Sequence, residues 1–312
     1  MKISVKAFAA SILLCAGISS NIAHANCDTV RFSDVGWTDI TATTAVSSVI
    51  LDALGYKTET KLLSVPVTYA SLAKGDIDVF LGNWMPTMEG DIAAYREAGQ
   101  VDTVRENLEG AKYTLTTNAK GAAAGLQSFA DIAKFREQLD GKIFGIEPGN
   151  DGNRIILDMI NSNAFGLNGF EVVESSEQGM LAQVARAKKR DEMVVFLGWE
   201  PHPMNANFDL TYLAGGDDYF GPNLGGATVY TNTSAGYVKK CPNVGNFLKN
   251  LKFSLKMENE IMGDILNDNM DADKAAIKAL KADPSVLSDW LKDVTTKDGQ
   301  NGMTAVKAKL GL

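Results

Sequence analysis

Two short apolar segments, at residues 79–86 and 195–201, are near copies of each other. They read VFLGNWMP and VFLGWEP, and a third predicted strand, at 29–35, is also followed by Gly and Trp, at 36 and 37. A continuous apolar run of this length is typical of a strand that is buried on both faces. A buried strand that ends in Gly places the next side chain at the sheet edge, where open α/β sheets form their ligand crevices. The pattern predicts aromatic rings at such a crevice, unless a diverged duplication has simply repeated a core Trp.

Strand and helix patterns alternate along most of the chain. The expected strands lie at 29–35, 57–65, 77–81, 142–146, 170–174 and 193–197. The expected helices lie at 39–54, 67–74, 153–161 and 177–188. Such alternation predicts the α/β class, with parallel sheets covered by helices.

The alternation falls into two halves with the same order of strand, helix, strand, helix, strand. Because the Trp residues and the loop at 147–152 follow matching strands, two similar α/β lobes are expected to face each other across a ligand cleft. The chain is also longer than one compact core usually requires. We predict a first lobe from 26–111 and 215–312, a second lobe from 112–214, and two strands that cross between them as a hinge.

The first residues have the features of a secretory signal peptide. They combine a basic start at Lys2 and Lys6, an apolar stretch at 7–18 that is too short to span a membrane, and small residues up to Ala25. We predict that residues 1–25 are cleaved and that the mature protein is exported to the periplasm of a Gram-negative bacterium.

Charge and histidine content exclude several function classes. The formal net charge is −8, which argues against nucleic acid as a partner. After removal of the signal peptide one histidine is left, His202, and its isolation argues against a zinc site and against a His-dependent catalytic triad. We therefore predict a non-catalytic protein that uses no metal and no cofactor.

Two cysteines, Cys27 and Cys241, are left once the signal peptide is removed. In an oxidising compartment such a pair most simply forms one disulfide, with two free thiols as the alternative. A bridge would attach the start of the mature chain to a segment in its last third.

Aromatic rings at strand ends suit a ligand that carries a quaternary ammonium group. Such a group has no N–H to donate, so proteins hold it against aromatic faces, at about 0.5–2 kcal/mol per ring. Asp39, two residues after Trp37, and Asn150, in the matching loop of the second half, could bind an alcohol group of the same ligand. Helix capping is the alternative role for both. Trp290 lies on the apolar face of a C-terminal helix pattern, and we assign it to the core.

Five segments carry a resemblance to a known family, in the expected order and at comparable spacing. They are Gly36-Trp37-Thr38-Asp39, Gly82-Asn83-Trp84-Met85-Pro86, Lys112-Tyr113, Pro148-Gly149-Asn150-Asp151 and Gly198-Trp199-Glu200-Pro201. On these residues the mature chain resembles the periplasmic binding proteins of bacterial ABC importers for choline and glycine betaine. The resemblance implies a type II fold, in which two lobes joined by a two-stranded hinge close on the ligand.

The resemblance also implies a ligand site. Its aromatic box would be formed by Trp37, Trp84, Tyr113 and Trp199. Asp39 and Asn150 would hold the hydroxyl group of choline, and Asp151 would add a negative charge that favours the cation. The resemblance further implies that Cys27 and Cys241 are bridged.

The expected ligand is choline, with acetylcholine or betaines bound more weakly, and the expected protein partners are the permease subunits of an ABC transporter. The protein is expected to act as a monomer. A glycine betaine or proline betaine receptor with the same box is the nearest alternative. An enzyme that acts on a choline ester or on phosphocholine is disfavoured, because the chain has no Gly-x-Ser-x-Gly motif and too little histidine. A solute sensor that docks on a chemoreceptor or kinase would share every binding residue.

Overall fold

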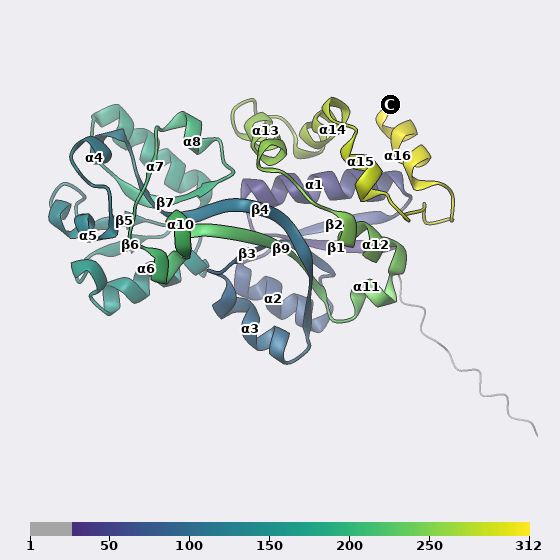
Figure 1. Ribbon diagram of the computed structural model, residues 1–312, viewed down its shortest axis with the longest axis horizontal. Helices are drawn as coiled ribbons and strands as arrows, with labels where there is room; N and C mark the ends of the chain where they lie inside the picture. Colours follow the sequence, from purple (N-terminus) through teal and green to yellow (C-terminus); the bar gives the residue numbers. More distant parts are fainter. Residues whose placement is uncertain (1–26) are drawn as a thin grey trace, which may run out of the picture.

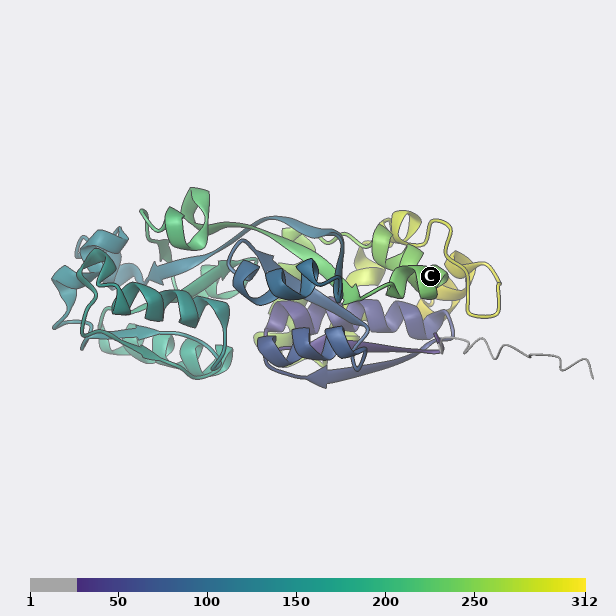
Figure 2. The same ribbon diagram turned by 90° about the horizontal axis from the view of Figure 1, so that it is seen from below.

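Two α/β lobes lie side by side in this protein (Figures 1 and 2). The computed structural model describes residues 27–312, so the predicted signal peptide at 1–25 lies outside the described residues. Between residues 27 and 312, no helix is both long and apolar enough to cross a membrane. The predicted α/β class and two-lobed architecture are confirmed.

The first lobe contains a sheet with helices on both faces. Its strands are β1 (Thr29–Asp34), β2 (Lys57–Leu62), β3 (Val79–Met85), β9 (Gly226–Ser234) and the first part of β4 (Val101–Thr117). Its helices are α1 (Thr38–Ala53), α2 (Val65–Lys74), α3 (Glu89–Glu97), α11 (Tyr237–Lys240), α12 (Pro242–Asn250), α13 (Leu255–Leu266), α14 (Ala272–Ala282), α15 (Val286–Trp290) and α16 (Gly302–Leu310). Helix α1 and the C-terminal helices cover one face, and α2 and α3 cover the other (Figure 1).

The second lobe is smaller and has shorter strands. They are β5 (Lys142–Phe144), β6 (Glu171–Val173), β7 (Val195–Glu200), β8 (Thr211–Tyr212) and the last part of β4. Its helices and helical turns are α4 (Ala119–Ala123), α5 (Phe129–Ile132), η1 (Ala133–Phe135), α6 (Asp151–Asn161), η2 (Ala164–Gly166), α7 (Glu177–Arg190), α8 (Met204–Asn207), α9 (Asp217–Phe220) and α10 (Pro222–Gly225). Helices α6 and α7 lie on either side of the short strands (Figure 1).

One hydrogen-bonded sheet runs through both lobes, in the order β2-β1-β3-β9-β4-β7-β5-β6, with β8 paired to β4. Strand β1 is parallel to β2 and β3, and β5 is parallel to β6 and β7, as the alternating pattern predicts. Strand β4 is 17 residues long and pairs antiparallel with β9 in the first lobe and with β7 in the second. It therefore belongs to both lobes, and together with the segment that leads into β9 it connects them (Figure 2).

The two copied segments form β3 and β7, and both strands continue past their Gly and through the Trp. The expectation that the strands end at Gly is wrong, and close packing is the reason. A Cβ on Gly82 would lie 2.5 Å from Cδ1 of Ile40, and one on Gly198 would lie 2.4 Å from Cγ2 of Thr116. Each Gly thus lets a neighbouring side chain approach the strand, while the Trp that follows still lies near the strand end.

The exact division of the chain into lobes at 26–111, 112–214 and 215–312 stays a prediction. Strand β4 passes the first boundary without a break. Just beyond the second boundary, α9 packs onto the second lobe, where the rings of Phe220 and Phe129 are 5.9 Å apart.

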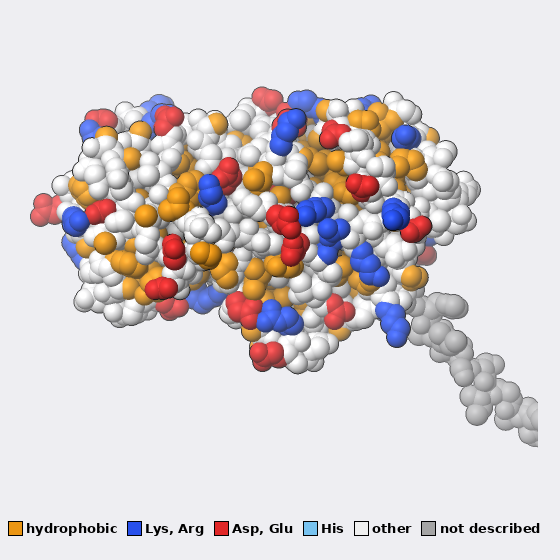
Figure 3. Space-filling model, viewed as in Figure 1, with side chains coloured by type: hydrophobic (Ala, Val, Ile, Leu, Met, Phe, Trp, Pro, Cys, Tyr) orange, Lys and Arg blue, Asp and Glu red, His pale blue; other side chains and the backbone are white. Residues whose placement is uncertain are grey.

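The C-terminal helices build structure away from the cleft. Trp290 is 2% exposed, its ring meets that of Phe253 at 5.4 Å, and its indole nitrogen donates a hydrogen bond to the carbonyl of Lys252. The assignment of Trp290 to the core is confirmed. On the surface shown in Figure 3, acidic and basic side chains are interspersed, so the net negative charge does not gather into one patch on that face.

A disulfide joins Cys27 to Cys241, with their Cα atoms 5.6 Å apart, which confirms the predicted bridge. It connects the residues that lead into β1 with the turn between α11 and α12. The bridge therefore closes a covalent loop with a sequence separation of 214 residues.

Reduction of this disulfide is expected to lower thermal stability and to leave ligand affinity nearly unchanged. For a loop of this length the chain-entropy model gives about 5 kcal/mol of stabilisation, and neither cysteine lines the cavity described below. The check is the melting temperature and the ligand Kd with and without reductant, with the Cys27→Ser, Cys241→Ser double variant as the matched control. A reduced protein with an unchanged melting temperature would contradict this expectation.

Candidate functional site

A cavity lies between the two lobes and is lined by residues from both. About 270 Å³ within it, including space that is open to solvent, is free of protein atoms. The lining residues are Trp37, Asp39, Trp84, Tyr113, Ile146, Asp151 and Trp199. Six of the seven residues predicted for the ligand site are thus brought together, and the seventh, Asn150, lies directly behind them. Ile146 also lines the cavity. The sequence did not predict this, because Ile146 simply ends an apolar strand pattern.

Tyr113 is the central ring of the aromatic wall. It lies on β4 directly opposite Trp199 of β7 in the sheet. Its ring centroid is 6.2 Å from that of Trp84 and 6.2 Å from that of Trp199, with interplanar angles of 62° and 74°. Each Trp ring is therefore steeply inclined to the Tyr113 ring, and the three rings form adjacent walls of the cavity. Together with Trp37 the box has four rings, each at most 6% exposed.

Trp37 is held in place from the opposite lobe. It is the N-cap residue of α1, and its indole nitrogen donates to both carboxylate oxygens of Glu147, at 2.9 and 3.0 Å. Burial raises the pKa of Glu147 to about 7. Sequence reasoning missed Glu147, although it follows the first strand of the second half just as Trp37 follows that of the first, and this matching position could have indicated it.

Asp39 lies at the first turn of α1 and is 2% exposed. Its Oδ2 accepts a hydrogen bond from the indole nitrogen of Trp84 at 3.0 Å, and its Oδ1 has no hydrogen-bond partner. The N-cap position belongs to Trp37, so Asp39 contacts a box residue instead of capping the helix. Burial, followed by the nearby charge of Glu177, raises the pKa of Asp39 to about 8.

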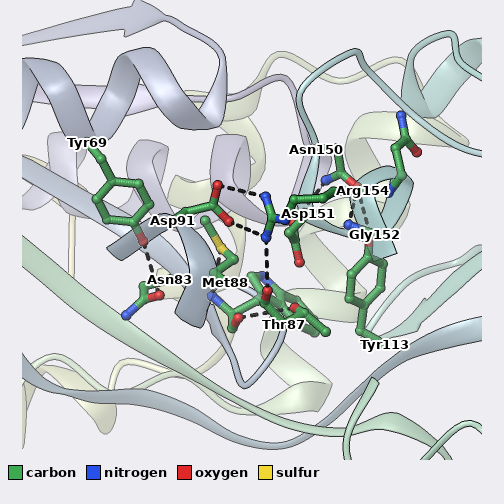
Figure 4. Close-up of polar contacts among 12 residues, drawn as sticks. Tyr69, Asn83, Thr87, Met88, Asp91, Tyr113, Asn150, Asp151, Gly152 and Arg154 are labelled. Atoms are coloured by element: carbon green, nitrogen blue, oxygen red, sulfur yellow. Dashed lines mark hydrogen bonds and ion pairs between the residues drawn. The ribbon is translucent and has the colours of Figure 1, made fainter. Parts of the chain in front are cut away.

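Asn150 caps α6, as the alternative interpretation of this residue expects. Its Oδ1 accepts hydrogen bonds from the backbone N–H groups of Gly152 at 2.8 Å and Asn153 at 3.2 Å. The same oxygen accepts from the hydroxyl of Tyr113 at 2.9 Å (Figure 4). Asn150 therefore fixes the orientation of a box ring, and its Nδ2 donates to Oδ1 of Asp151 at 3.2 Å.

Asp151 is the second acidic residue of the cavity lining, and it comes from the second lobe. It is 1% exposed, and its Oδ2, like Oδ1 of Asp39, has no hydrogen-bond partner. Burial raises the pKa of Asp151 to about 6. The cavity is thus walled by aromatic rings and contains two buried carboxyl groups, each with one oxygen left unpaired.

An ion pair joins the lobes beside the cavity. Arg154 of α6 donates to both carboxylate oxygens of Asp91 of α3, each at 2.9 Å (Figure 4). A bidentate pair of this kind has a fixed geometry, so it restricts how the lobes can approach each other. Sequence reasoning did not predict it, because the partners are separated by 63 residues and each is an ordinary charged residue on a helix.

The cavity lining consists of four aromatic rings, one aliphatic side chain and two carboxyl groups. No Ser, Cys, Lys or His is among the residues that line the cavity. Over residues 27–312, no cluster of His, Cys, Asp or Glu side chains could hold a metal ion. Two α/β lobes that share a hinge strand and enclose a ring-lined cavity define a two-lobed substrate-binding protein.

Residues 28–282 match a family model described as the substrate-binding domain of the ABC-type glycine betaine transport system, and the chain belongs to this family. It is therefore a non-catalytic binding component of an ABC transporter, with the predicted fold of a periplasmic binding protein.

Solved structures share this fold over nearly their whole length. An ABC-transporter choline-binding protein in complex with choline is 69% identical, with a TM-score of 0.91 over 91% of this chain and 99% of that one. An ABC-transporter choline-binding protein in an unliganded semi-closed conformation is also 69% identical, with a TM-score of 0.85 over 92% of this chain and 100% of that one. Lactococcal OpuAC, closed and complexed with glycine betaine, is 25% identical, with a TM-score of 0.77 over 85% of this chain and 99% of that one.

Proposed function

We propose that this chain binds choline in the cavity between its lobes and delivers it to the permease of an ABC transporter. The observation that carries the proposal is the pair of unpaired carboxylate oxygens, Oδ1 of Asp39 and Oδ2 of Asp151, in a cavity lined by four aromatic rings. A buried carboxylate is costly unless a cation or hydrogen-bond donors compensate it. Choline carries a cation and one hydroxyl donor, and so offers both kinds of compensation.

The aromatic box would hold the trimethylammonium group. Each ring contributes about 0.5–2 kcal/mol to binding a cation, and the larger values apply when water is excluded. Because all four rings are buried, their sum could supply much of the roughly 8 kcal/mol that micromolar affinity requires. The predicted box of Trp37, Trp84, Tyr113 and Trp199 is therefore retained as the proposed ammonium site.

The choline hydroxyl would donate to Oδ1 of Asp39. Asn150 would not accept a hydrogen bond from the choline hydroxyl, because its Oδ1 already accepts three hydrogen bonds. Its role would be to orient Tyr113 and to offer the remaining Nδ2 hydrogen to the hydroxyl oxygen. Asp151 would face the cation and add attraction from the second lobe.

Similarity to the choline complex supports choline as the ligand, since that protein is 69% identical along nearly the whole chain. We further propose that residues 1–25 are a cleaved signal peptide and that the mature protein works in the periplasm as a monomer, with lobes at 26–111 plus 215–312 and at 112–214.

Glycine betaine is the second candidate, favoured by the family description and by the ligand of lactococcal OpuAC. It carries the same ammonium group but ends in a carboxylate, which Asp39 and Asp151 repel when they are ionised. Titration of the purified protein with choline, acetylcholine, glycine betaine and proline betaine, followed by Trp fluorescence, separates the candidates. Tighter binding of either betaine than of choline would refute the proposal, and recovery of unchanged ligand by mass spectrometry would exclude turnover.

Choline affinity is expected to fall as the pH is lowered. Burial raises the pKa values of Asp39 to about 8 and of Asp151 to about 6, so in the empty site Asp39 is mostly protonated at neutral pH and Asp151 becomes protonated as the pH falls through about 6. A bound cation favours the ionised carboxylates and lowers both pKa values, so binding releases protons. Affinity should therefore rise with pH up to about 8 and then level off.

The expected change in the choline Kd is at least about tenfold between pH 8 and pH 6, because one pKa unit corresponds to about 1.4 kcal/mol. Choline itself does not titrate in this range, so the dependence reports the protein alone. Isothermal titration calorimetry in two buffers of different ionisation enthalpy measures the protons released. A Kd that stays constant over this range would contradict the assignment of the carboxyl groups.

A further inference from the structure

We propose that Glu177 and His202 form a latch that holds the lobes closed and positions Trp199. The part of the proposal that concerns ligand release rests on the proposed function, whereas the latch contacts themselves form in the protein without ligand. Neither residue lines the cavity, and both are only 1% exposed.

Glu177 reaches from one lobe to the other. It is the first residue of α7 in the second lobe, and its two carboxylate oxygens accept hydrogen bonds from the backbone N–H of Thr38 at 2.9 Å and from the Thr38 hydroxyl at 2.5 Å. Thr38 is the first residue of α1 in the first lobe. The carboxylate therefore lies at the positive end of a helix of 16 residues, a position that favours a negative charge.

His202 connects this carboxylate to the aromatic box. Its Nδ1 accepts a hydrogen bond from the backbone N–H of Met204 at 2.9 Å, so the ring proton is on Nε2. That nitrogen faces Oε1 of Glu177 at 3.2 Å and donates to it. The imidazole ring also meets the ring of Trp199 at 5.0 Å and an angle of 70°.

These contacts form a continuous path from Thr38 through Glu177 and His202 to Trp199. Thr38 lies between Trp37 and Asp39 in the sequence. The path therefore connects these two cavity residues of the first lobe with Trp199 of the second lobe. When the lobes separate, Glu177 loses both Thr38 donors and keeps only His202. Loss of two hydrogen bonds to a buried charge opposes opening, so the latch should act mainly on the rate of ligand release.

The test compares Glu177→Ala with Ser176→Ala. Glu177→Ala removes the latch, and the choline dissociation rate measured by stopped-flow Trp fluorescence should increase about tenfold or more, with the association rate within about twofold of wild type. Without ligand, small-angle X-ray scattering should show a larger radius of gyration for Glu177→Ala than for wild type, because the closed population falls.

Ser176→Ala is the matched control for a structural role of this region. The Ser176 hydroxyl oxygen caps α7 by accepting from the N–H of Gly179 at 3.1 Å and takes no part in the latch. It should lower the melting temperature while leaving the dissociation rate and the scattering of the ligand-free protein unchanged. Thr38→Val, which removes one donor to Glu177, should give a smaller increase in dissociation rate and serves if Glu177→Ala does not fold.

A wild-type dissociation rate together with wild-type scattering in the folded Glu177→Ala or Thr38→Val protein would overturn the latch. Equal effects of Ser176→Ala and Glu177→Ala would also overturn it, in favour of a purely structural role. If wild type gave no response to choline, the proposed function would fail, while the scattering comparison would still decide the latch.

Discussion

The Trp84→Ala variant should bind choline about a hundredfold more weakly than wild type while remaining folded. The substitution removes a box ring, worth about 0.5–2 kcal/mol or more in a dry site. It also removes the indole N–H that donates to Oδ2 of Asp39. This donor favours the ionised form of Asp39, so its loss raises the pKa of that carboxyl group and weakens the attraction for the cation. The two losses together are expected to reach the roughly 2.8 kcal/mol that corresponds to a factor of a hundred.

Trp84→Phe helps to separate the two contributions, since it keeps an aromatic ring, although a smaller one, and loses the N–H donor. Its affinity should lie between those of wild type and Trp84→Ala. Calorimetric titration with choline measures all three Kd values, and circular dichroism melting checks the fold. Wild-type affinity in the folded fraction of Trp84→Ala, accompanied by a large loss of stability, would mean that Trp84 is a core residue and not a binding residue.

Asp39→Asn should reduce choline affinity about thirtyfold and narrow the preference for choline over glycine betaine. Asparagine keeps the size of the side chain but removes the charge opposite the cation and replaces one acceptor oxygen with a donor NH₂ group. The loss of a charged hydrogen bond corresponds to about 2 kcal/mol. A donor at this position would also suit the carboxylate of a betaine, which the native aspartate repels.

The measurement is the ratio of the glycine betaine and choline Kd values for Asp39→Asn and for wild type. Asp151→Asn is the matched comparison, because it removes a buried carboxylate from the same cavity on the second lobe. Asp151→Asn should weaken the binding of both ligands, because both carry the ammonium cation. It should change the ratio of the two Kd values less than Asp39→Asn does. An unchanged ratio in Asp39→Asn would return Asp39 to a structural role at the start of α1.

Much of the fold could be predicted because strands and helices each produce a characteristic pattern of apolar residues over a short stretch of sequence. The strands β1 and β5 to β7 and the helices α1, α2, α6 and α7 lie within a few residues of their expected positions. Tyr113 is different, since residues 112–115 read as a plain strand and only the family resemblance indicates a ring for the box. Its place opposite Trp199 depends on the pairing of two strands that are far apart in sequence.

Apart from Ile146, the residues that sequence reasoning missed make their contacts across the cleft. Glu147, Glu177 and Arg154 are charged residues in positions where a solvent-exposed side chain would be ordinary. Their partners are 110, 139 and 63 residues away, and no local pattern records such distances. Each becomes recognisable only when the two lobes are placed together and the charge is found to be buried or paired.

The hinge strand β4 has a consequence for the order in which the site is assembled. Tyr113 is paired with Trp199 through the sheet of the second lobe and bonded to Asn150, so these contacts persist when the lobes part. In the same way Trp84 and Asp39 remain joined within the first lobe. In the open protein each lobe should therefore present a preformed half of the site, with aromatic rings and a carboxyl group. An arriving cation can bind to one half before the other lobe closes over it.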